Sequence, residues 1–453
     1  MLLRLRLLTQ SFVCDRLYVI GKKVTCYRKI EWVNVMQSNR EYYLNRLIQK
    51  KHSPYIKIVT GIRRCGKSHL LKTLFCNHLL SQGVERNQII VVELDDDRFE
   101  ELRERKALRT YIEEKASDDA RQYYIIIDEV QILKDFEGTI ISLNNHPNYD
   151  VYITGSNSEF LSKDISTRFK DRGVEIRIHP LSYAEFYEVY EGDRHFALQE
   201  YLTFGGMPYL LNESDEAEKM RYLTNLIDRT YLTDVVERNR VRLTEELSAL
   251  FDVLCSTTGS LVNPSSLAGT LQAEKHIKID SETVFSYIQY MEDAFLFETA
   301  RRYNIKGKAY FTTPFKYYPE DVGLRNARLH FRQLDHGFGI ETVVYNELRR
   351  RGYLVDVGML DTRERDSTGK QIHKQKEVDF IARMASLEYY IQVMDRIPDG
   401  QHGENEYDSL KKVPGSFRKI AVINAPFKAY SDENGILIIS LEEFLLNQNS
   451  LLF

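Results

Sequence analysis

The segment that decides the fold is Gly61-Ile62-Arg63-Arg64-Cys65-Gly66-Lys67-Ser68. The apolar run Tyr55–Thr60 precedes it, and residues 69–75 follow it with the spacing of a helix. A strand, a glycine-bounded loop that ends in Lys-Ser, and a helix together form a phosphate-binding loop. Its backbone N–H groups turn inward around a phosphate, and the amino-terminal end of the helix adds partial positive charge. The sequence therefore predicts a nucleotide-binding α/β protein.

The side chains of this loop have separate expected roles. Lys67 should reach the β- and γ-phosphates, and Ser68 should hold Mg²⁺. The predicted nucleotide-contacting residues are Gly61, Ile62, Arg63, Arg64, Cys65, Gly66, Lys67, Ser68 and His69. Cys65 is interpreted as a small side chain that the loop tolerates. ATP and Mg²⁺ are the predicted cofactors, and GTP stays open because no motif for base specificity is visible.

A second motif lies about sixty residues further along the chain. The apolar run Gln122–Ile127 is a predicted strand that ends in Asp128 and Glu129. A strand buried on both faces tolerates carboxylates only at its exit, and in phosphate-loop folds that exit faces the phosphates. Asp128 should coordinate Mg²⁺, directly or through water, and Glu129 should polarise the attacking water. The order of the two motifs predicts an enzyme that hydrolyses ATP.

Three further apolar runs complete a predicted five-stranded sheet: residues 87–94, 151–154 and 174–178. Helical segments between most of the strands indicate a doubly wound, parallel α/β sheet. Ser156 and Asn157 directly follow the strand 151–154. They are candidates for sensing the γ-phosphate or orienting the water, and ordinary turn residues are the alternative.

Two arginines before the last of these strands are further candidates for the site. Arg172 is the first choice and Arg168 the second. A guanidinium there would stabilise charge on the transferring phosphoryl group, in cis or across a subunit boundary. The second case requires an oligomer, and solvated surface arginines are the alternative.

Composition limits the class of protein. The chain has 453 residues, of which 43% are hydrophobic and 28% charged, as is typical of soluble globular proteins with several domains. Its net charge is −4, so DNA contact would require a local basic patch. Five cysteines without a CxxC pair argue against a disulfide framework or a zinc site and fit a reducing compartment. No apolar run predicts a membrane span, and we expect a cytoplasmic location and no membrane partner.

The first 35 residues have two interpretations. Arginines interrupt the leucine-rich start, which argues against a secretory signal. One interpretation is an upstream start codon, with Met36 as the true start, and the other is a basic extension. The nucleotide domain should cover residues 36–195.

The middle of the chain predicts two helical parts. Residues 196–245 are rich in helix, contain the turn Gly205–Pro208 and resemble a lid or connector. Residues 246–327 predict a winged helix, with three helices and a two-stranded wing near residues 247–254, 264–271, 280–295, 296–303 and 308–312.

A winged helix would suggest DNA as a partner. The basic residues near the predicted wing are Arg301, Arg302, Lys306 and Lys308. The predicted recognition helix carries the acids Asp280, Glu282, Glu292 and Asp293, which would repel phosphates. A module that packs against protein is therefore favoured, and DNA contact stays open.

Residues 328–453 predict an α/β domain with a helix near 341–351 and strands near 353–357, 377–382, 389–394, 419–424 and 436–439. This order outlines a restriction-endonuclease-like core, in which acids hold Mg²⁺ near a lysine. Glu341 and Asp379 are the candidate acids. The third strand should read Glu-x-Lys but reads Gln392-Val393-Met394. We therefore expect a nuclease-like fold used for binding rather than for cleavage.

Several short blocks support a resemblance over residues 36–453: 60–68, 127–131, 153–157, 180–186, 205–208, 321–326 and 377–380. With these blocks the chain resembles prokaryotic AAA-type ATPases that carry a carboxy-terminal domain of unknown function with a nuclease-like fold. The resemblance implies an ATPase core, a winged-helix-like middle and a nuclease-like tail. The family pattern often has Gly-Arg where this chain has Asp171-Arg172.

Three hypotheses about function follow. The leading one is an ATPase that couples nucleotide state to domain arrangement. The alternative is a nucleotide-gated protein that binds DNA or another protein with little turnover. A third is an ATP-dependent nuclease, against which the missing Glu-x-Lys counts. Glu129 favours the first, because a pure binding protein needs no base at that position.

Overall fold

The structure is a computed structural model that describes residues 19–20, 23–24, 38–118, 120–155, 169, 171–332, 336–365, 371–396, 407–415 and 417–451. Residues 1–36 form one unit, in which β1 (Val19–Ile20) pairs antiparallel with β2 (Lys23–Val24). Residues 37–453 form the second unit, which contains every predicted site. In the described part of the chain, no helix has the length and apolar character needed to cross a membrane.

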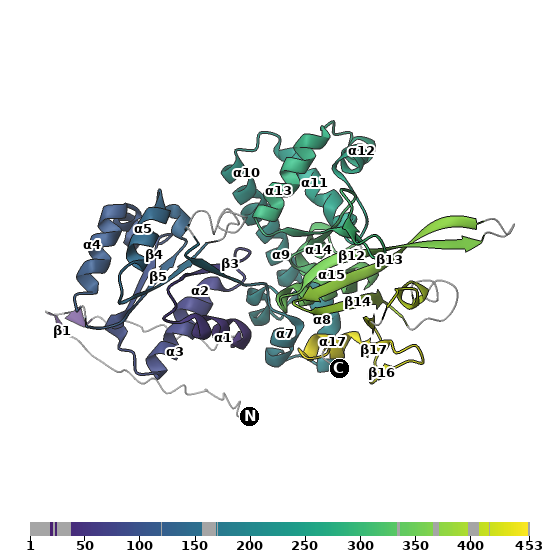
Figure 1. Ribbon diagram of the computed structural model, residues 1–453. Helices are drawn as coiled ribbons and strands as arrows, with labels where there is room; N and C mark the ends of the chain where they lie inside the picture. Colours follow the sequence, from purple (N-terminus) through teal and green to yellow (C-terminus); the bar gives the residue numbers. More distant parts are fainter. Residues whose placement is uncertain are drawn as a thin grey trace, which may run out of the picture. The chain divides into compact units, whose positions relative to one another are not determined.

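A five-stranded parallel sheet forms the first part of the larger unit (Figure 1). Its strands are β3 (Ile56–Thr60), β4 (Ile89–Glu93), β5 (Tyr123–Asp128), β6 (Tyr149–Thr154) and β7 (Gly173–Arg177). The order across the sheet is β4-β5-β6-β3-β7, and every neighbouring pair is parallel. Strand β3, which carries the first motif, therefore lies between β6 and β7.

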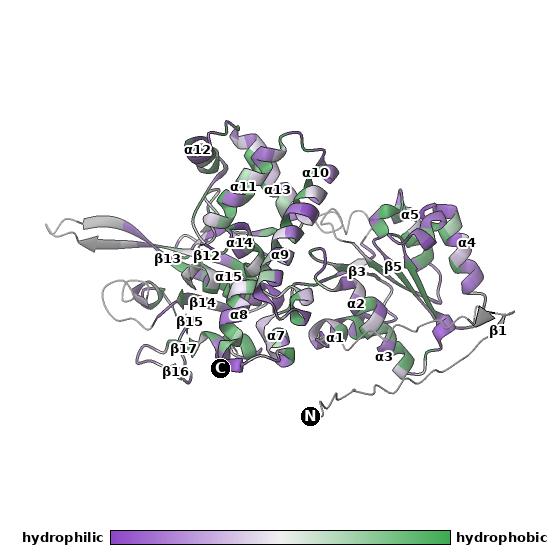
Figure 2. Cartoon of the chain, turned by 180° about the vertical axis from the view of Figure 1, so that it is seen from behind, coloured by the Kyte–Doolittle hydropathy of each residue, from purple (hydrophilic) through white to green (hydrophobic). Residues whose placement is uncertain are grey.

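Alternate residues of these strands bury their side chains on opposite faces. Ile125 and Ile127 pack with α4 (Arg105–Lys115) and α5 (Phe136–Asn144) on one face. Ile126 packs on the other face. That face is covered by α1 (Glu41–Lys50) and by the helix after the loop: α2 (Lys67–His69), a π-helical segment (Leu70–Phe75) and α3 (Cys76–Ser81). Figure 2 shows the hydrophobic strands β3 and β5 between these helices. The predicted doubly wound parallel sheet is confirmed.

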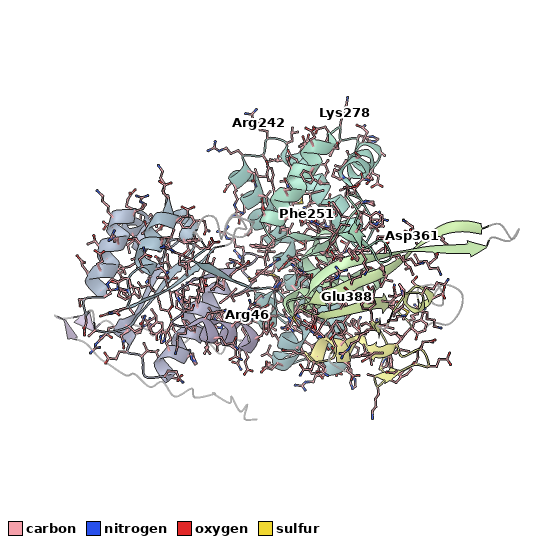
Figure 3. All side chains as sticks on the ribbon, viewed as in Figure 1. Arg46, Arg242, Phe251, Lys278, Asp361 and Glu388 are labelled. Carbon is pink, nitrogen blue, oxygen red and sulfur yellow. The ribbon has the colours of Figure 1, made fainter. Side chains whose placement is uncertain are left out.

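Helices follow the sheet from residue 183 to residue 293. They are α7 (Tyr183–Val189), α8 (Ala197–Phe204), α9 (Glu216–Leu226), α10 (Leu232–Asn239), α11 (Thr244–Ser256), α12 (Pro264–Lys275) and α13 (Ser281–Asp293). Phe251 of α11, labelled in Figure 3, is buried and meets Phe297 edge to face, with ring centroids 5.3 Å apart. This contact ties the helices to β8 (Phe297–Ala300), which pairs antiparallel with β11 (Lys316–Pro319).

The predicted wing is formed only in part by the two expected strands. The first, 296–303, is divided between β8 and β9 (Arg302–Asn304). β9 pairs with β10 (Ala309–Tyr310) and also parallel with a strand of the carboxy-terminal sheet. Only the first half of the predicted strand pairs elsewhere, because the partner of β8 follows β9 and β10 in the sequence and local pattern does not determine strand pairing.

The carboxy-terminal sheet has eight strands in the order β10-β9-β12-β13-β14-β15-β17-β16. Its other strands are β12 (Leu354–Arg365), β13 (Gln371–Met384), β14 (Leu387–Met394), β15 (Arg418–Ile423), β16 (Tyr430–Ser431) and β17 (Leu437–Ser440). Two helices pack with it, α15 (His336–Arg350) and α17 (Leu441–Leu446). The five predicted strands of this domain are present, and β12 and β13 extend far beyond their predicted ends as a ribbon (Figure 1).

Two short sequence blocks meet where α8 crosses α14 (Val322–Arg328). A Cβ on Gly323 would lie 1.9 Å from the carbonyl oxygen of Phe204, and one on Gly205 would lie 2.0 Å from Oδ1 of Asp321. Asp321 caps α14 by accepting hydrogen bonds from the N–H groups of Gly323 and Leu324, and it also accepts one from Gly206 at 2.7 Å. The crossing therefore requires glycine at position 205, directly after α8, and at position 323 of α14.

Candidate nucleotide-binding site

The phosphate loop turns sharply where β3 ends. Gly61 has φ +140°, and a Cβ there would lie 2.0 Å from the carbonyl oxygen of Ile178, while Gly66 has φ +104°. The N–H group of Ile178 donates to the carbonyl of Thr60 at 2.8 Å, so the segment after β7 runs beside the start of the loop. Glycine is required at position 61 by both its backbone conformation and this close approach.

The lysine of the loop lies over its own backbone. Lys67 is 4% exposed, and its ammonium donates to the carbonyls of Gly61 at 2.9 Å and Ile62 at 3.1 Å. These bonds hold the positive charge at the face of the loop, within reach of a group bound by the loop N–H donors.

The two predicted metal ligands come together although they are far apart in sequence. Ser68 Oγ donates to Asp128 Oδ1 at 3.1 Å. Asp128 is 2% exposed at the carboxyl end of β5. A serine hydroxyl beside a carboxylate is the pair that holds Mg²⁺ in phosphate-loop proteins, so these residues fit the ion.

Two contacts of Asp128 come from residues that the sequence analysis did not select. Thr154, the last residue of β6, donates its hydroxyl to Asp128 Oδ1 at 2.5 Å. Lys72 lies 3.0 Å from Asp128 Oδ2 and also bonds Glu93. Lys72 stands four residues after Ser68, one helical turn away, and this spacing was the available signal.

Glu129 follows Asp128 in a left-handed backbone conformation, with φ 52°. Its N–H group donates to Thr154 Oγ1 at 2.9 Å, and the amide of Gln131 donates to its carboxylate. Thr154 thus contacts both acids of the second motif. A left-handed conformation is unusual for glutamate. The side chains of Glu129 and Asp128 therefore leave the backbone in different directions.

The remaining predicted site residues have different outcomes. Ser156, Asn157 and Arg168 lie outside the described residues. Arg172 precedes β7, where its carbonyl accepts from the N–H group of Ile56 and its side chain donates to Asn145. This is the end of the sheet opposite the phosphate loop, roughly 13 Å of strand away. A role for Arg172 in cis is therefore wrong, and a role across a subunit boundary stays a prediction.

Helical residues beyond the sheet contact the phosphate loop. Arg63 forms an ion pair with Asp234 of α10, with Nη1 2.7 Å from each carboxylate oxygen. Tyr231 donates its hydroxyl to the carbonyl of Arg63 at 2.9 Å. Partial burial acts against the charge of Arg63, but Asp234 outweighs it and raises the pKa of the guanidinium. The loop and α10 are thus joined at one residue.

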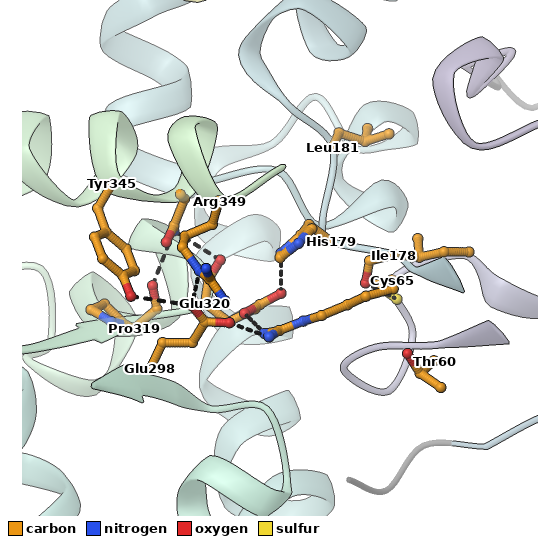
Figure 4. A network of polar contacts seen from close by, with 12 residues as sticks. Thr60, Cys65, Ile178, His179, Leu181, Glu298, Pro319, Glu320, Tyr345 and Arg349 are labelled. Atoms are coloured by element: carbon orange, nitrogen blue, oxygen red, sulfur yellow. Dashed lines mark hydrogen bonds and ion pairs between the residues drawn. The ribbon is translucent and has the colours of Figure 1, made fainter. Parts of the chain in front are cut away.

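A polar network leads from the loop to the carboxy-terminal part of the chain (Figure 4). Thr60 donates to Glu175 at 2.8 Å, and Cys65 approaches the carbonyl of Ile178 at 3.5 Å. Arg177 lies two residues after Glu175 on β7. It forms ion pairs with Glu298 and with Glu320, the latter at 2.6 Å.

Further contacts extend this network in both directions. His179 lies 2.7 Å from Glu320, and Arg349 of α15 lies 2.7 Å from Glu298. Arg177, Glu298 and Arg349 line a cavity of about 780 Å³. The strand β7, which pairs with the loop strand, therefore also carries the link to α15.

A second cluster contains the two predicted acids of the carboxy-terminal domain. Lys316 of β11, which is 3% exposed, lies 2.9 Å from Glu341 and 2.6 Å from Glu377. Burial acts against its charge, but the two glutamates outweigh this and raise the pKa of Lys316. Asp379 accepts hydrogen bonds from the side chain of Gln392 and the N–H of Val393, and burial raises its pKa well above the ordinary value. The described residues include no metal-binding group of three or more His, Cys, Asp or Glu side chains.

Comparisons with known proteins agree with this architecture. A family model described as an AAA domain matches residues 53–187, and a model of a domain of unknown function matches residues 195–335. An uncharacterised protein of Haemophilus influenzae is 33% identical over 413 residues, covering 90% of this chain and 98% of its own length. An uncharacterised protein of Methanocaldococcus jannaschii is 26% identical, covering 92% of this chain and 91% of its own.

Two solved structures with bound nucleotide are similar to this chain at a low level. The Aeropyrum pernix ORC2 protein in ADPNP–ADP complexes has a TM-score of 0.36 and 11% identity, covering 65% of this chain and 92% of its own. AMPPCP-bound DnaA from Aquifex aeolicus has a TM-score of 0.26 and 15% identity, covering 56% of this chain and 88% of its own.

Proposed function

Since this chain belongs to the same protein family as the uncharacterised Haemophilus influenzae protein and contains an AAA domain, we propose that it is a Mg²⁺-dependent ATPase. The observation that carries the proposal is the meeting of Ser68, Asp128, Thr154 and Glu129 beside the phosphate loop. A binding site alone needs the first two of these residues, whereas Glu129 adds a base where the γ-phosphate would be attacked.

The residues of the site have separate roles in the proposed reaction. Loop N–H groups and Lys67 bind and orient the triphosphate, and Ser68 with Asp128 would hold Mg²⁺, which neutralises phosphate charge when bound. Thr154 fixes the carboxylate of Asp128 and the backbone of Glu129. Glu129 orients a water molecule and accepts its proton. The chemistry therefore depends on positioning and electrostatics rather than on covalent catalysis.

The network through β7 supports the further proposal that nucleotide state alters domain arrangement. Thr60 and Cys65 belong to or border the loop, and Arg177, two residues along β7 from Glu175, reaches Glu298 and Glu320. A shift of the loop is therefore transmitted to β7 and on to α15. DNA and another protein remain the two candidate partners, in a cytoplasmic protein that assembles into an oligomer if Arg172 acts in trans.

The test is steady-state ATP hydrolysis with Mg²⁺, with and without DNA. Wild type should turn over ATP. Lys67→Ala should abolish turnover, and Glu129→Gln should lower it about 10²–10⁴-fold while ATP still binds. Lys106→Ala, on the exposed side of α4, is the matched control and should behave as wild type.

A wild-type chain that binds ATP but matches Glu129→Gln in showing no turnover would sink the enzyme proposal. The nucleotide-gated binding protein would then be the better assignment. DNA stimulation of turnover would select DNA as the partner.

A further inference from the structure

Arg63 is the third residue of the phosphate loop, and its side chain lies near three carboxylates. The carboxylates of Asp234, Glu129 and Asp95 all act on its guanidinium. Glu129 marks the side from which the γ-phosphate would be attacked. The next arginine, Arg64, has φ 66° and bonds Tyr222 of α9 instead. The two arginines of the loop therefore face different surroundings.

The partner of Arg63 is a carboxylate that a phosphate can replace. Both oxygens of Asp234 lie 2.7 Å from Nη1, and the two side chains are 46% and 23% exposed. Exposed ion pairs contribute only about 0.2–1 kcal/mol. A bound triphosphate carries several negative charges and, unlike Asp234, which contacts a single guanidinium nitrogen, can accept two parallel hydrogen bonds from the guanidinium. It is therefore the stronger competitor for Arg63.

We propose that Arg63 is a catalytic arginine supplied in cis, which leaves Asp234 to contact the γ-phosphate of bound ATP. This inference rests on the proposed ATPase function and identifies both a catalytic residue and its regulation. Asp234 belongs to α10. When Arg63 contacts the γ-phosphate, α10 is released from the loop, and when Arg63 pairs with Asp234, α10 is held against it. ADP has no γ-phosphate and leaves the pair with Asp234 intact.

The charge on Arg63 acts on a balanced hydrolysis step. The oxygen of a water molecule bonds to the γ-phosphorus, and the bond from that phosphorus to the β–γ bridging oxygen breaks. The water proton passes to Glu129, and ADP leaves with the electrons of the broken bond. Arg63 forms and breaks no covalent bond, and it stabilises the charge on the γ-phosphoryl oxygens.

Two measurements with Mg²⁺ test this inference: hydrolysis of ATP, and binding of ADP and of the analogue AMPPNP by calorimetry. Arg63→Ala should lower kcat about 10²–10³-fold and abolish any preference for AMPPNP over ADP, while ADP affinity stays within about threefold of wild type. Arg63→Lys should recover part of kcat, because lysine restores the positive charge but not the paired N–H donors of a guanidinium. Asp234→Asn should raise AMPPNP affinity about threefold to tenfold and leave ADP affinity unchanged. Arg109→Ala, which removes an exposed ion pair on α4, is the control.

Each outcome decides something. Wild-type turnover that persists in Arg63→Ala overturns the inference and leaves the ATPase proposal standing. Equal losses of ADP and AMPPNP affinity in Arg63→Ala also overturn it, because they show a role in loop structure alone. A wild-type chain that binds neither nucleotide overturns the proposed function and this inference with it. Specific activity that rises with protein concentration would assign the catalytic arginine to a second subunit.

Discussion

At the scale of the single residue, Lys316 sets the charge of the cluster around Glu341, Glu377 and Asp379. Its ammonium contacts two of the three carboxylates, and Tyr318 donates its hydroxyl to Glu341 as well. The donors facing these acids are therefore an ammonium, a phenol, the amide of Gln392 and a backbone N–H. The arrangement satisfies the acids through hydrogen bonds and one internal cation.

Lys316→Met should destabilise the protein by about 3 kcal/mol, because it leaves buried glutamates without their counter-charge. Urea unfolding measures the change. Adding Glu341→Gln should restore part of the loss, since one of the unpaired charges disappears. Lys412→Met removes an exposed pair with Asp408 and should cost under about 0.5 kcal/mol. Equal losses for the two lysine variants would contradict this account of the cluster.

The residues of the nucleotide site and of the carboxy-terminal acidic cluster divide into those a sequence can reveal and those it cannot. Ser68 and Asp128 were predictable, because each ends or follows a recognisable apolar run and the fold brings such strand ends together. Thr154 and Lys316 were not, since their contacts depend on which strands neighbour one another. Glu377 was passed over for Asp379, although it is Glu377 that lies 2.6 Å from Lys316.

At the scale of the element, α13 joins β8 through a carboxyl group with an altered pKa. Glu292 accepts a hydrogen bond from Thr299, and burial, together with the nearby Glu298, raises its pKa from 4.5 to about 7. The folded state therefore holds this proton more tightly than the unfolded state. The stability it contributes is complete below pH 4.5 and is lost as pH rises through about 7.

Glu292→Gln should remove this pH dependence, because glutamine stays neutral and its carbonyl still accepts from Thr299. At pH 8 the variant should be more stable than wild type by about 1–3 kcal/mol, and the two should converge toward pH 4.5. Thermal unfolding between pH 4.5 and pH 8 measures the difference. Glu282→Gln, on the exposed side of the same helix, should follow wild type. A difference that is constant with pH would exclude titration of Glu292 as its cause.

Most elements were predictable where an apolar run had clear ends. Strands β3, β5 and β14 lie within one or two residues of their predicted bounds, since each is buried and bounded by polar residues. The ends of β12 and β13 were missed because the outer part of their ribbon is polar and lacks that signal. The wing was predicted only in part, because β9 pairs with β10 as expected whereas β8 pairs with β11, which follows them in the sequence.

At the scale of the whole molecule, β7 is the shared element between the nucleotide sheet and α15. Arg177 carries the link, since it pairs with both Glu298 and Glu320. Burial disfavours its charge, but these glutamates outweigh burial and raise the pKa of its guanidinium. Both glutamates therefore favour the charged form of Arg177.

Arg177→Met should uncouple the two parts, because Glu298 and Glu320 lose the residue that joins them to β7. In wild type, adding ATP should change amide hydrogen exchange in α15 as well as in the loop. In the variant the change in the loop should persist and that in α15 should fall by more than half. Arg383→Met is a matched control, because Arg383 also pairs with two acids and is similarly exposed. An undiminished response of α15 would place the coupling elsewhere.

The crossing of α8 and α14 has a consequence for how such chains can be recombined. Gly205 and Gly206 lie more than a hundred residues before Asp321 and Gly323, yet each pair leaves no room for change in the other. A chimera that takes residues 205–208 from one relative and 321–326 from another must keep both halves of this joint compatible. Exchange of the two segments together should be tolerated far better than exchange of either alone, so the two segments should be transferred as a single module.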